Sequence, residues 1–168
     1  LVEIVSEGDR SNESLDSLGG TGVFATALRT ALLAGEVDVI VHSAKDLPTA
    51  PADGIRIAAF PTRVDARDVL VSRGGLTLEA LAPGAVVGTG SPRRRAQLLA
   101  ARPDVQVVGI RGNVDSRLRR VLDAEHPDPL DAIVLAAAGL DRLGRLGDVT
   151  EYFDLNRWPT APAQGALA

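Results

Sequence analysis

The chain has 168 residues, a formal net charge of −4 at pH 7 and no cysteine. Its length is enough to bury a hydrophobic core, as one domain or two small ones. The absence of cysteine excludes disulfides, thiolate metal sites and a cysteine nucleophile within these residues. Two histidines without metal-ligand spacing argue against a zinc site. The acidic balance and the lack of a membrane-length apolar run argue against a general nucleic-acid or membrane surface.

The first third of the chain predicts one helix among short strands. Residues 1–5 resemble a strand, and the polar, glycine-containing run 6–20 predicts a loop. Apolar residues at helical spacing predict a helix over 23–33, which Gly35 ends. Two further strands are predicted, at 37–42 and 55–60.

From residue 68 onward, predicted strands and helices alternate. A strand over 68–72 is followed by a short helix near 77–81. The remaining predicted strands are 85–89, 105–110 and 131–135, and the remaining helices are 92–101, 114–124 and 137–143. This alternation with short loops indicates an α/β fold whose parallel sheet is covered by helices on both faces.

A helix beginning at Ser91 places arginine where a cation is disfavoured. Ser91 suits the N-cap and Pro92 suits the first helical position. Arg93 and Arg94 then fall in the first turn, whose free N–H donors and partial positive charge attract anions. A solvated surface run is the alternative, but the context predicts an anionic ligand here. Successive helical residues point ~100° apart, so Arg95 is expected to face solvent.

The segments after the predicted strands carry most of the residues with useful chemistry. In open α/β sheets, ligands bind beyond the carboxyl ends of the strands. The residues that would converge there are Ser43, Lys45, Asp46, Gly90, Ser91, Arg93, Arg94, Arg111, Gly112, Asn113, Arg117, Ala136 and Gly139. Arginine pairs bidentately with carboxylate or phosphate, and these cations exceed what one carboxylate needs. A basic, glycine-lined cleft for a ligand with several anionic groups is therefore predicted.

Asp46 is the one acid among these cations. One interpretation is a structural ion pair with Lys45 or a nearby arginine, or a turn before Leu47-Pro48. The other is a carboxylate kept ionised by positive neighbours, which stabilises a cationic intermediate or transfers protons. His42 lies within a strand run and is expected to be a core residue. Asn113 is expected to cap the helix that follows it.

Six motifs in one order resemble those of a single enzyme family. They are Gly19–Phe24 (GGTGVF), Val41–Pro48 (VHSAKDLP), Gly88–Arg94 (GTGSPRR), Arg111–Val114 (RGNV) with Arg117, Asp131–Leu143 with its LAAAGL, and Pro162–Ala166 (PAQGA). Each is weak alone, but together they are specific and span nearly the whole chain. By these motifs the chain resembles hydroxymethylbilane synthase, also called porphobilinogen deaminase, a transferase family of tetrapyrrole (porphyrin and haem) biosynthesis.

The resemblance implies an α/β protein of two periplasmic-binding-protein-like (type 2) domains with mainly parallel sheets, joined by hinges. Domain 1 would comprise 1–60 and about 162–168, and domain 2 would comprise 67–158. The hinges would be 61–66 and 159–161. The family's N-terminal strand and its third, α+β domain are absent from these residues, so the chain is expected to be a fragment that is inactive by itself.

The resemblance also implies the reaction and its residues. The family condenses four porphobilinogen units head to tail and releases ammonia at each step. The growing polypyrrole chain is held on a dipyrromethane cofactor, which a thioether attaches to a cysteine of the third domain. Asp46 matches the catalytic aspartate, which contacts pyrrole N–H groups and stabilises the azafulvene cation left by ammonia loss. The positions that match cofactor or substrate contacts are Ser43, Lys45, Thr89, Ser91, Arg93, Arg94, Arg111, Gly112, Arg117, Ala136, Gly139 and Gln164.

The chain departs from the family pattern at one position, and two other functions are alternatives to the enzyme. Many members have a lysine where this chain has Thr21, so a side-chain role there is lost or moved. The resemblance implies a cytoplasmic monomer with porphobilinogen as partner and without nucleic acid, membrane or metal. The alternative is a non-enzymatic solute-binding protein of the same fold for an acidic ligand. A nucleic-acid binder ranks last, because it needs a basic face with stacking aromatics, and the chain has only five aromatic residues.

Overall fold

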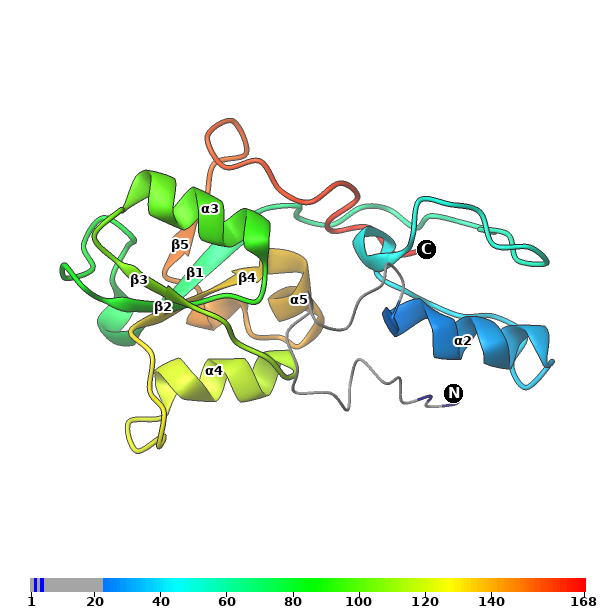
Figure 1. Cartoon of the computed structure of the whole chain (residues 1–168), viewed down its shortest axis with the longest axis horizontal. Coiled ribbons are helices and arrows are strands. Elements are labelled where there is room, and N and C mark those ends of the chain that lie inside the picture. Colours follow the sequence, from blue (N-terminus) through cyan, green and yellow to red (C-terminus); the bar gives the residue numbers. More distant parts are fainter. Residues whose placement is uncertain (1, 3, 5–22) are drawn as a thin grey trace. The chain divides into compact units, whose positions relative to one another are not determined.

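The computed structural model of the chain describes residues 2, 4 and 23–168. The chain divides into two compact units: unit 1 comprises Leu1–Val64 and Pro162–Ala168, and unit 2 comprises Asp65–Ala161. It therefore leaves unit 1 once and returns to it (Figure 1). The predicted strand 1–5, the predicted loop 6–20 and Thr21 lie wholly or largely outside the described residues.

Unit 2 is built on one five-stranded sheet. Its strands are β1 (Asp68–Ser72), β2 (Val86–Gly88), β3 (Gln106–Val108), β4 (Ala132–Ala136) and β5 (Glu151–Tyr152), in the spatial order β3-β2-β4-β1-β5. β2 pairs in parallel with β3 and β4, whereas β1 pairs antiparallel with β4 and β5. The predicted α/β character is confirmed, and the four strands predicted in this unit all form, within two residues of their predicted bounds.

β1 departs from the parallel arrangement that the alternation predicts. Parallel strands need a crossover connection, usually a helix, and the helix predicted near 77–81 does not form. The structure has a turn there, in which the Ala80 N–H donates to the Thr77 carbonyl at 3.1 Å. Five residues ahead of Pro83 are too few to form a helix without strong tertiary support. With no crossover helix between β1 and β2, β1 runs opposite to β2 and to β4, which is parallel to β2.

Three helices pack on the sheet: α3 (Pro92–Ala101), α4 (Val114–Leu122) and α5 (Ala137–Arg142). α3 and α4 begin where predicted because a side chain caps each of them. Ser91 Oγ accepts a bond from the Arg94 N–H at 3.4 Å, and Asn113 Oδ1 accepts one from the Ser116 N–H at 2.9 Å. Arg95 is exposed, as predicted. Figure 1 shows α3 and α4 on opposite sides of the sheet.

Each face of the sheet carries its own hydrophobic core, because successive side chains of a strand point to opposite faces. One core contains Leu70 together with Leu98 of α3. The other contains Val69 with Leu118 of α4 and Leu140 of α5. All five side chains are essentially inaccessible to solvent, and each such burial stabilises the fold by about 1.5–3 kcal/mol. The two cores fix the helices and the loops before them against the sheet.

Unit 1 contains the helix α2 (Val23–Leu33), whose bounds are those predicted from the sequence. Gly35 follows it with a φ of 71°, a left-handed conformation that glycine adopts without strain. No helix in the described part of the chain is long and apolar enough to cross a membrane.

Neither of the strands predicted at 37–42 and 55–60 forms. In the part of unit 1 that the structure describes, the only strand pairing is an antiparallel bridge between Ser43 and Leu167. Beside it, His42 and Ala168 exchange two backbone hydrogen bonds of 2.9 Å. A β-branched run becomes a stable strand only where another backbone pairs with it, and the described residues supply none for most of these two runs.

Candidate functional site

The carboxyl edge of the sheet in unit 2 gathers residues from four strands. β2, β3 and β4 run in the same direction, so the segments after Gly88, Val108 and Ala136 leave the same edge. β1 runs the other way, and its first residue, Asp68, pairs with Ala136 at this edge. The reversal of β1 therefore adds to this edge an acid that was not among the predicted site residues.

Thr89, Gly90 and Ser91 form the turn between β2 and α3. Thr89 is buried, and its Oγ1 accepts a hydrogen bond from the Ser91 N–H at 3.2 Å. A Cβ on Gly90 would lie 2.8 Å from the carbonyl oxygen of Ile110, so a side chain there would force a shift. The hydroxyl groups of Thr89 and Ser91 thus hold the turn, and their predicted contacts to a ligand stay predictions.

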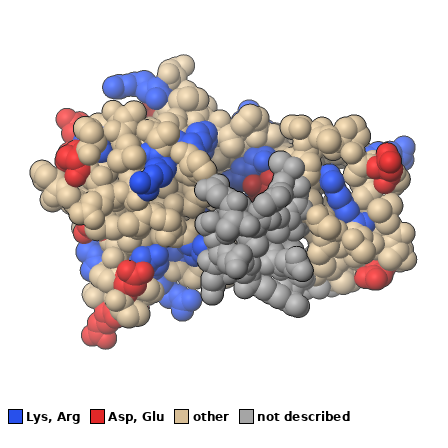
Figure 2. All heavy atoms as spheres, in the orientation of Figure 1, with Lys and Arg blue, Asp and Glu red and all other residues tan. Residues whose placement is uncertain are grey.

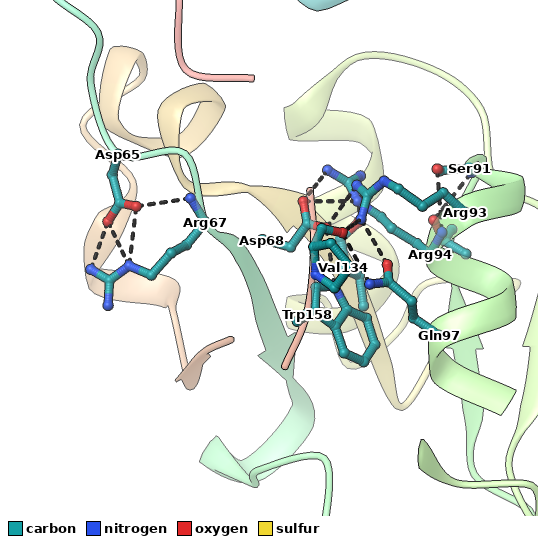
Figure 3. Close-up of polar contacts among 11 residues, drawn as sticks. Asp65, Arg67, Asp68, Ser91, Arg93, Arg94, Gln97, Val134 and Trp158 are labelled. Atoms are coloured by element: carbon teal, nitrogen blue, oxygen red, sulfur yellow. Dashed lines mark hydrogen bonds and ion pairs between the residues drawn. The ribbon is translucent and has the colours of Figure 1, made fainter. Parts of the chain in front are cut away.

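Asp68 binds both arginines of the first turn of α3 (Figure 3). Its Oδ1 accepts hydrogen bonds from Arg94 Nε at 3.1 Å and from Arg94 Nη2 at 2.7 Å. Its Oδ2 lies 2.8 Å from Arg93 Nη2 and accepts a bond from Trp158 Nε1 at 3.1 Å. Asp68 is fully buried, and a buried charge is costly unless it is paired and hydrogen-bonded. Four donors on two oxygens meet that condition.

The two arginines differ in how far they are enclosed. Arg94 is buried, and its Nη1 also donates to the Val134 carbonyl at 3.1 Å. The Arg93 side chain keeps 27% of its surface exposed. Its Nη1 donates to Gln97 Oε1 at 2.7 Å and to the Pro159 carbonyl at 2.8 Å. Arg93 therefore presents more of its charge to the surface than Arg94 does.

A second group of cations follows β3. Arg111 and Gly112 precede the cap of α4, and Arg117 lies one turn into that helix. Gly112 has a φ of 94°, and its carbonyl accepts a bond from Arg117 Nε at 2.8 Å. Burial lowers the pKa of Arg117, and repulsion from Arg94 and Arg111 lowers it further. Arg94 and Arg111 therefore lie close enough to Arg117 to repel it, which favours an anion beside Arg117.

The exposed charge of unit 2 is mixed. Figure 2 shows basic and acidic side chains interspersed with neutral surface on the visible face of this unit. The arginine cluster at the sheet edge is a local concentration of positive charge.

Ser43, Lys45 and Asp46 lie close together in unit 1. The last two belong to a 3-10 turn over Ala44–Asp46, in which the Asp46 N–H donates to the Ser43 carbonyl at 3.0 Å. The end of the chain holds this turn, because the Ala44 N–H donates to the Ala166 carbonyl at 3.0 Å. Asp46 is exposed and Lys45 is half-buried. The carboxylate is thus open to solvent on a backbone that is fixed.

The other predicted residues occupy structural positions. Gln164 is 1% exposed, and its backbone carbonyl accepts a bond from Arg63 Nε at 2.8 Å. Ala136 ends β4 and Gly139 lies within α5. A Cβ on Gly139 would be 3.8 Å from Val114 Cγ2, an ordinary contact distance. Packing does not demand glycine there, and its role in ligand approach stays a prediction.

Asp68 was missed in the sequence, although a signal for it exists. It opens the strand Asp68–Ser72, in which every residue is buried. An acidic residue is almost never fully buried without a partner, so an acid at the start of an apolar strand indicates a buried cation nearby. The partner itself could not be named, because it depends on the direction of β1.

A family model described as "Porphobilinogen deaminase, dipyromethane cofactor binding domain" matches residues 1–168. The chain belongs to the porphobilinogen deaminase family. Proteins named porphobilinogen deaminase from Leifsonia xyli subsp. xyli and Thermobifida fusca are 61% and 59% identical to it over 168 residues. One from Cutibacterium acnes is 56% identical over 174 residues. Each match covers the whole chain but 50%, 51% and 52% of those relatives, so the chain spans about half their length.

Proposed function

We propose that the polypeptide carrying this chain is hydroxymethylbilane synthase, a transferase that condenses four porphobilinogen units head to tail and releases ammonia at each step. Membership of the porphobilinogen deaminase family supports the reaction. The arginine cluster in unit 2 supports the chemical class of the substrate. Porphobilinogen carries an acetate and a propionate group, and each added unit brings two more carboxylates.

The observation that carries this proposal is the setting of Arg117. The charged groups that shift its pKa, Arg94 and Arg111, are both cations, and burial disfavours its charge as well. Asp68 supplies one negative charge to Arg93 and Arg94 together, whereas the charged groups that shift the pKa of Arg117 include no such acid. A carboxylate beside Arg117 relieves that repulsion, and arginine binds carboxylate through two parallel hydrogen bonds.

The donor set of unit 2 also fits a dipyrromethane cofactor, because such a group carries several carboxylates. Arg93, Arg94, Arg111 and Arg117 are the residues of this unit that would hold them. When bound, the cofactor supplies the pyrrole end to which new units are joined. These 168 residues contain no cysteine, so the thioether that attaches the cofactor forms on a residue outside them.

We assign the chemical step to Asp46. Its exposed carboxylate, beside Lys45 in the turn Ala44–Asp46, is suited to stabilise the positive charge that develops on a pyrrole as ammonia leaves. It also lies where it can accept a proton. Ser43, Lys45 and Gln164 would contact cofactor or substrate from the same unit. Thr89, Ser91, Gly112, Ala136 and Gly139 would do so from unit 2.

The proposal extends to the architecture. Two type 2 periplasmic-binding-protein-like domains, connected by hinges at 61–66 and 159–161, would bind the growing chain. The division of the chain into two units, with boundaries at Val64–Asp65 and Ala161–Pro162, supports this arrangement. A cytoplasmic, monomeric enzyme is part of the same proposal, on the strength of the family resemblance.

Arg117→Gln tests the proposed function, with Arg119→Gln as its matched control. Both residues lie on α4, and Arg119 is exposed. In the complete polypeptide, the wild type should convert porphobilinogen to hydroxymethylbilane. Arg117→Gln should lower kcat/KM about 10- to 100-fold, since it removes a charge-assisted bond to a carboxylate. Arg119→Gln should match the wild type.

Two results would overturn the proposal. Absence of hydroxymethylbilane from the folded wild-type polypeptide, assayed with cofactor present, would reject the reaction. Equal kcat/KM values for the two variants would reject the assignment of the arginine cluster to the substrate. A thermal melt of each variant shows that the comparison is made between folded proteins.

A further inference from the structure

Asp68 is a buried carboxylate that the proposed reaction does not use. It lies at the start of β1, opposite Ala136, where the segments that follow β2 and β4 leave the sheet. Its surroundings are rigid, because Val69 to Val71 next to it are fully buried in the two cores. The Asp68 carboxylate is therefore held in place by the sheet, and the side chains that bind it must orient toward it.

The contacts of Asp68 fix two guanidinium groups of the same helical turn. Arg94 donates to Oδ1 through both Nε and Nη2, so the plane of its guanidinium is set by the carboxylate. Arg93 reaches Oδ2 with one nitrogen, Nη2, at 2.8 Å. Trp158 Nε1 donates to the same oxygen at 3.1 Å, and its ring stacks on Phe153 with centroids 4.2 Å apart. The indole thus holds the carboxylate in one orientation (Figure 3).

The charge balance shows why one acid is present. Two adjacent guanidinium groups in a buried setting repel each other, and that repulsion grows as water is excluded. A single carboxylate between them reduces that repulsion and holds both in place. Arg93, with 27% of its side chain exposed, is the more accessible of the two to a ligand.

We infer that Asp68 is a positioning residue, which sets the orientation of Arg93 and Arg94 so that the cluster binds the carboxylates of the substrate. This rests on the proposed function, in that the arginines are taken to bind porphobilinogen or the growing chain. Asp68 acts through the arginines and does not touch the ligand. Its removal is therefore expected to change binding more than the chemical step.

The test compares Asp68→Asn and Asp68→Glu with Asp104→Asn in the complete polypeptide. Asp104 is the matched control, because it forms an ion pair of 2.6 Å with Arg102 at the opposite end of α3. Asp68→Asn should raise KM for porphobilinogen about 10- to 100-fold, the range expected when charge-assisted hydrogen bonds are lost. Asp68→Glu keeps the charge and should raise KM less, by roughly 3- to 10-fold. Asp104→Asn should leave KM unchanged.

The division between KM and kcat separates positioning from a purely structural role. A structural role would reduce the amount of folded enzyme, and so the apparent kcat, at constant KM. An unchanged KM in folded Asp68→Asn overturns the inference. If Asp68→Asn shows no cooperative thermal transition, Asp68→Glu decides: a raised KM supports the inference and an unchanged KM overturns it.

A second readout does not depend on turnover. Citrate, a tricarboxylate, should raise the melting temperature of the wild type, because a ligand that binds the folded state stabilises it. The shift should be retained in Asp104→Asn and reduced in both Asp68 variants. If the wild type does not convert porphobilinogen, the proposed function fails, and the citrate shifts still decide the role of Asp68. Equal shifts in all variants overturn it.

Discussion

Two runs of similar sequence, one in each unit, have opposite surroundings. Residues 37–41 in unit 1 leave Val39 and Val41 71% and 68% exposed. Residues Ala132–Ala136 in unit 2 form β4, flanked by β1 and β2, and Ile133 is inaccessible to solvent. Both runs are mostly apolar. An apolar run is therefore buried as a strand only where neighbouring strands and helices cover it.

The candidate residues differ between the units in the same way. In unit 2, Arg94 is buried and held by Asp68, on a helix that packs against a complete core. In unit 1, Asp46 is exposed on a short turn whose backbone contacts include the bond from Ala44 to Ala166. We therefore expect changes at Asp46 to affect chemistry without affecting stability, and changes in unit 2 to affect both.

The largest expected effect is that of Asp46→Asn in the complete polypeptide. Loss of the carboxylate should lower kcat about 10²- to 10⁴-fold, the usual contribution of a positioned acid or base. The free energy of unfolding should change by less than about 0.5 kcal/mol, since Asp46 is exposed. Asp53→Asn, another exposed acid of unit 1, is the control. Near-wild-type turnover in Asp46→Asn would contradict the assigned role.

The comparison of the two runs is tested by Ile133→Ala and Val41→Ala. Ile133→Ala should cost about 2–5 kcal/mol, because it leaves a cavity between β4 and the helices of its face. Val41→Ala should cost less than about 0.5 kcal/mol, because its side chain is already in solvent. Urea denaturation followed by circular dichroism measures both values. Equal losses of unfolding free energy in the two variants would show that the Val41 side chain is covered in solution.

A smaller effect is expected where two loops of unit 2 touch. Gly90→Ala should destabilise the protein by about 1–3 kcal/mol, because the new methyl group collides with the Ile110 carbonyl. Gly109→Ala is the matched control, since a Cβ at Gly109 meets nothing within 4 Å. The same denaturation experiment should show Gly109→Ala at or slightly above wild-type stability. A neutral Gly90→Ala would mean that the loops separate easily.

The smallest effect concerns pH at the first residue of unit 2. A hydrogen bond from the Arg67 side chain lowers the pKa of Asp65. A carboxyl whose pKa is lower in the folded state stabilises the protein above its ordinary pKa and loses that contribution as the pH falls through the folded value. Asp65→Asn should therefore melt below the wild type at pH 7, and the two curves should converge toward pH 3. A difference that is independent of pH would contradict this.

The sequence predicted the local features of unit 2 well. The start of α3 follows from Ser91 and Pro92, and the start of α4 follows from Asn113, because a cap is determined by a few neighbouring residues. The arginines of the predicted site are brought to one edge of the sheet for the same reason. Each lies at a fixed offset from a strand end and a helix start.

What the sequence did not predict depends on pairing between distant segments. The direction of β1 is set by β4, more than fifty residues later, and with it the position of Asp68 beside Arg94. Residues 37–42 and 55–60 have the composition of strands, but a strand also needs a partner backbone. Residues 77–81 have helical spacing, but they form a turn whose Leu78 and Leu81 are buried.

The contact of Gly90 with Ile110 has a consequence for selectivity. Gly90 lies just before the helical turn that carries Arg93, and Ile110 lies just before Arg111. Because the backbones of Gly90 and Ile110 pack closely together, the two groups of cations cannot move apart without breaking this contact. The distance between their positive charges is then a property of the fold and not of side-chain flexibility alone. Among acidic ligands of equal charge, those whose negative groups match this fixed spacing should bind best.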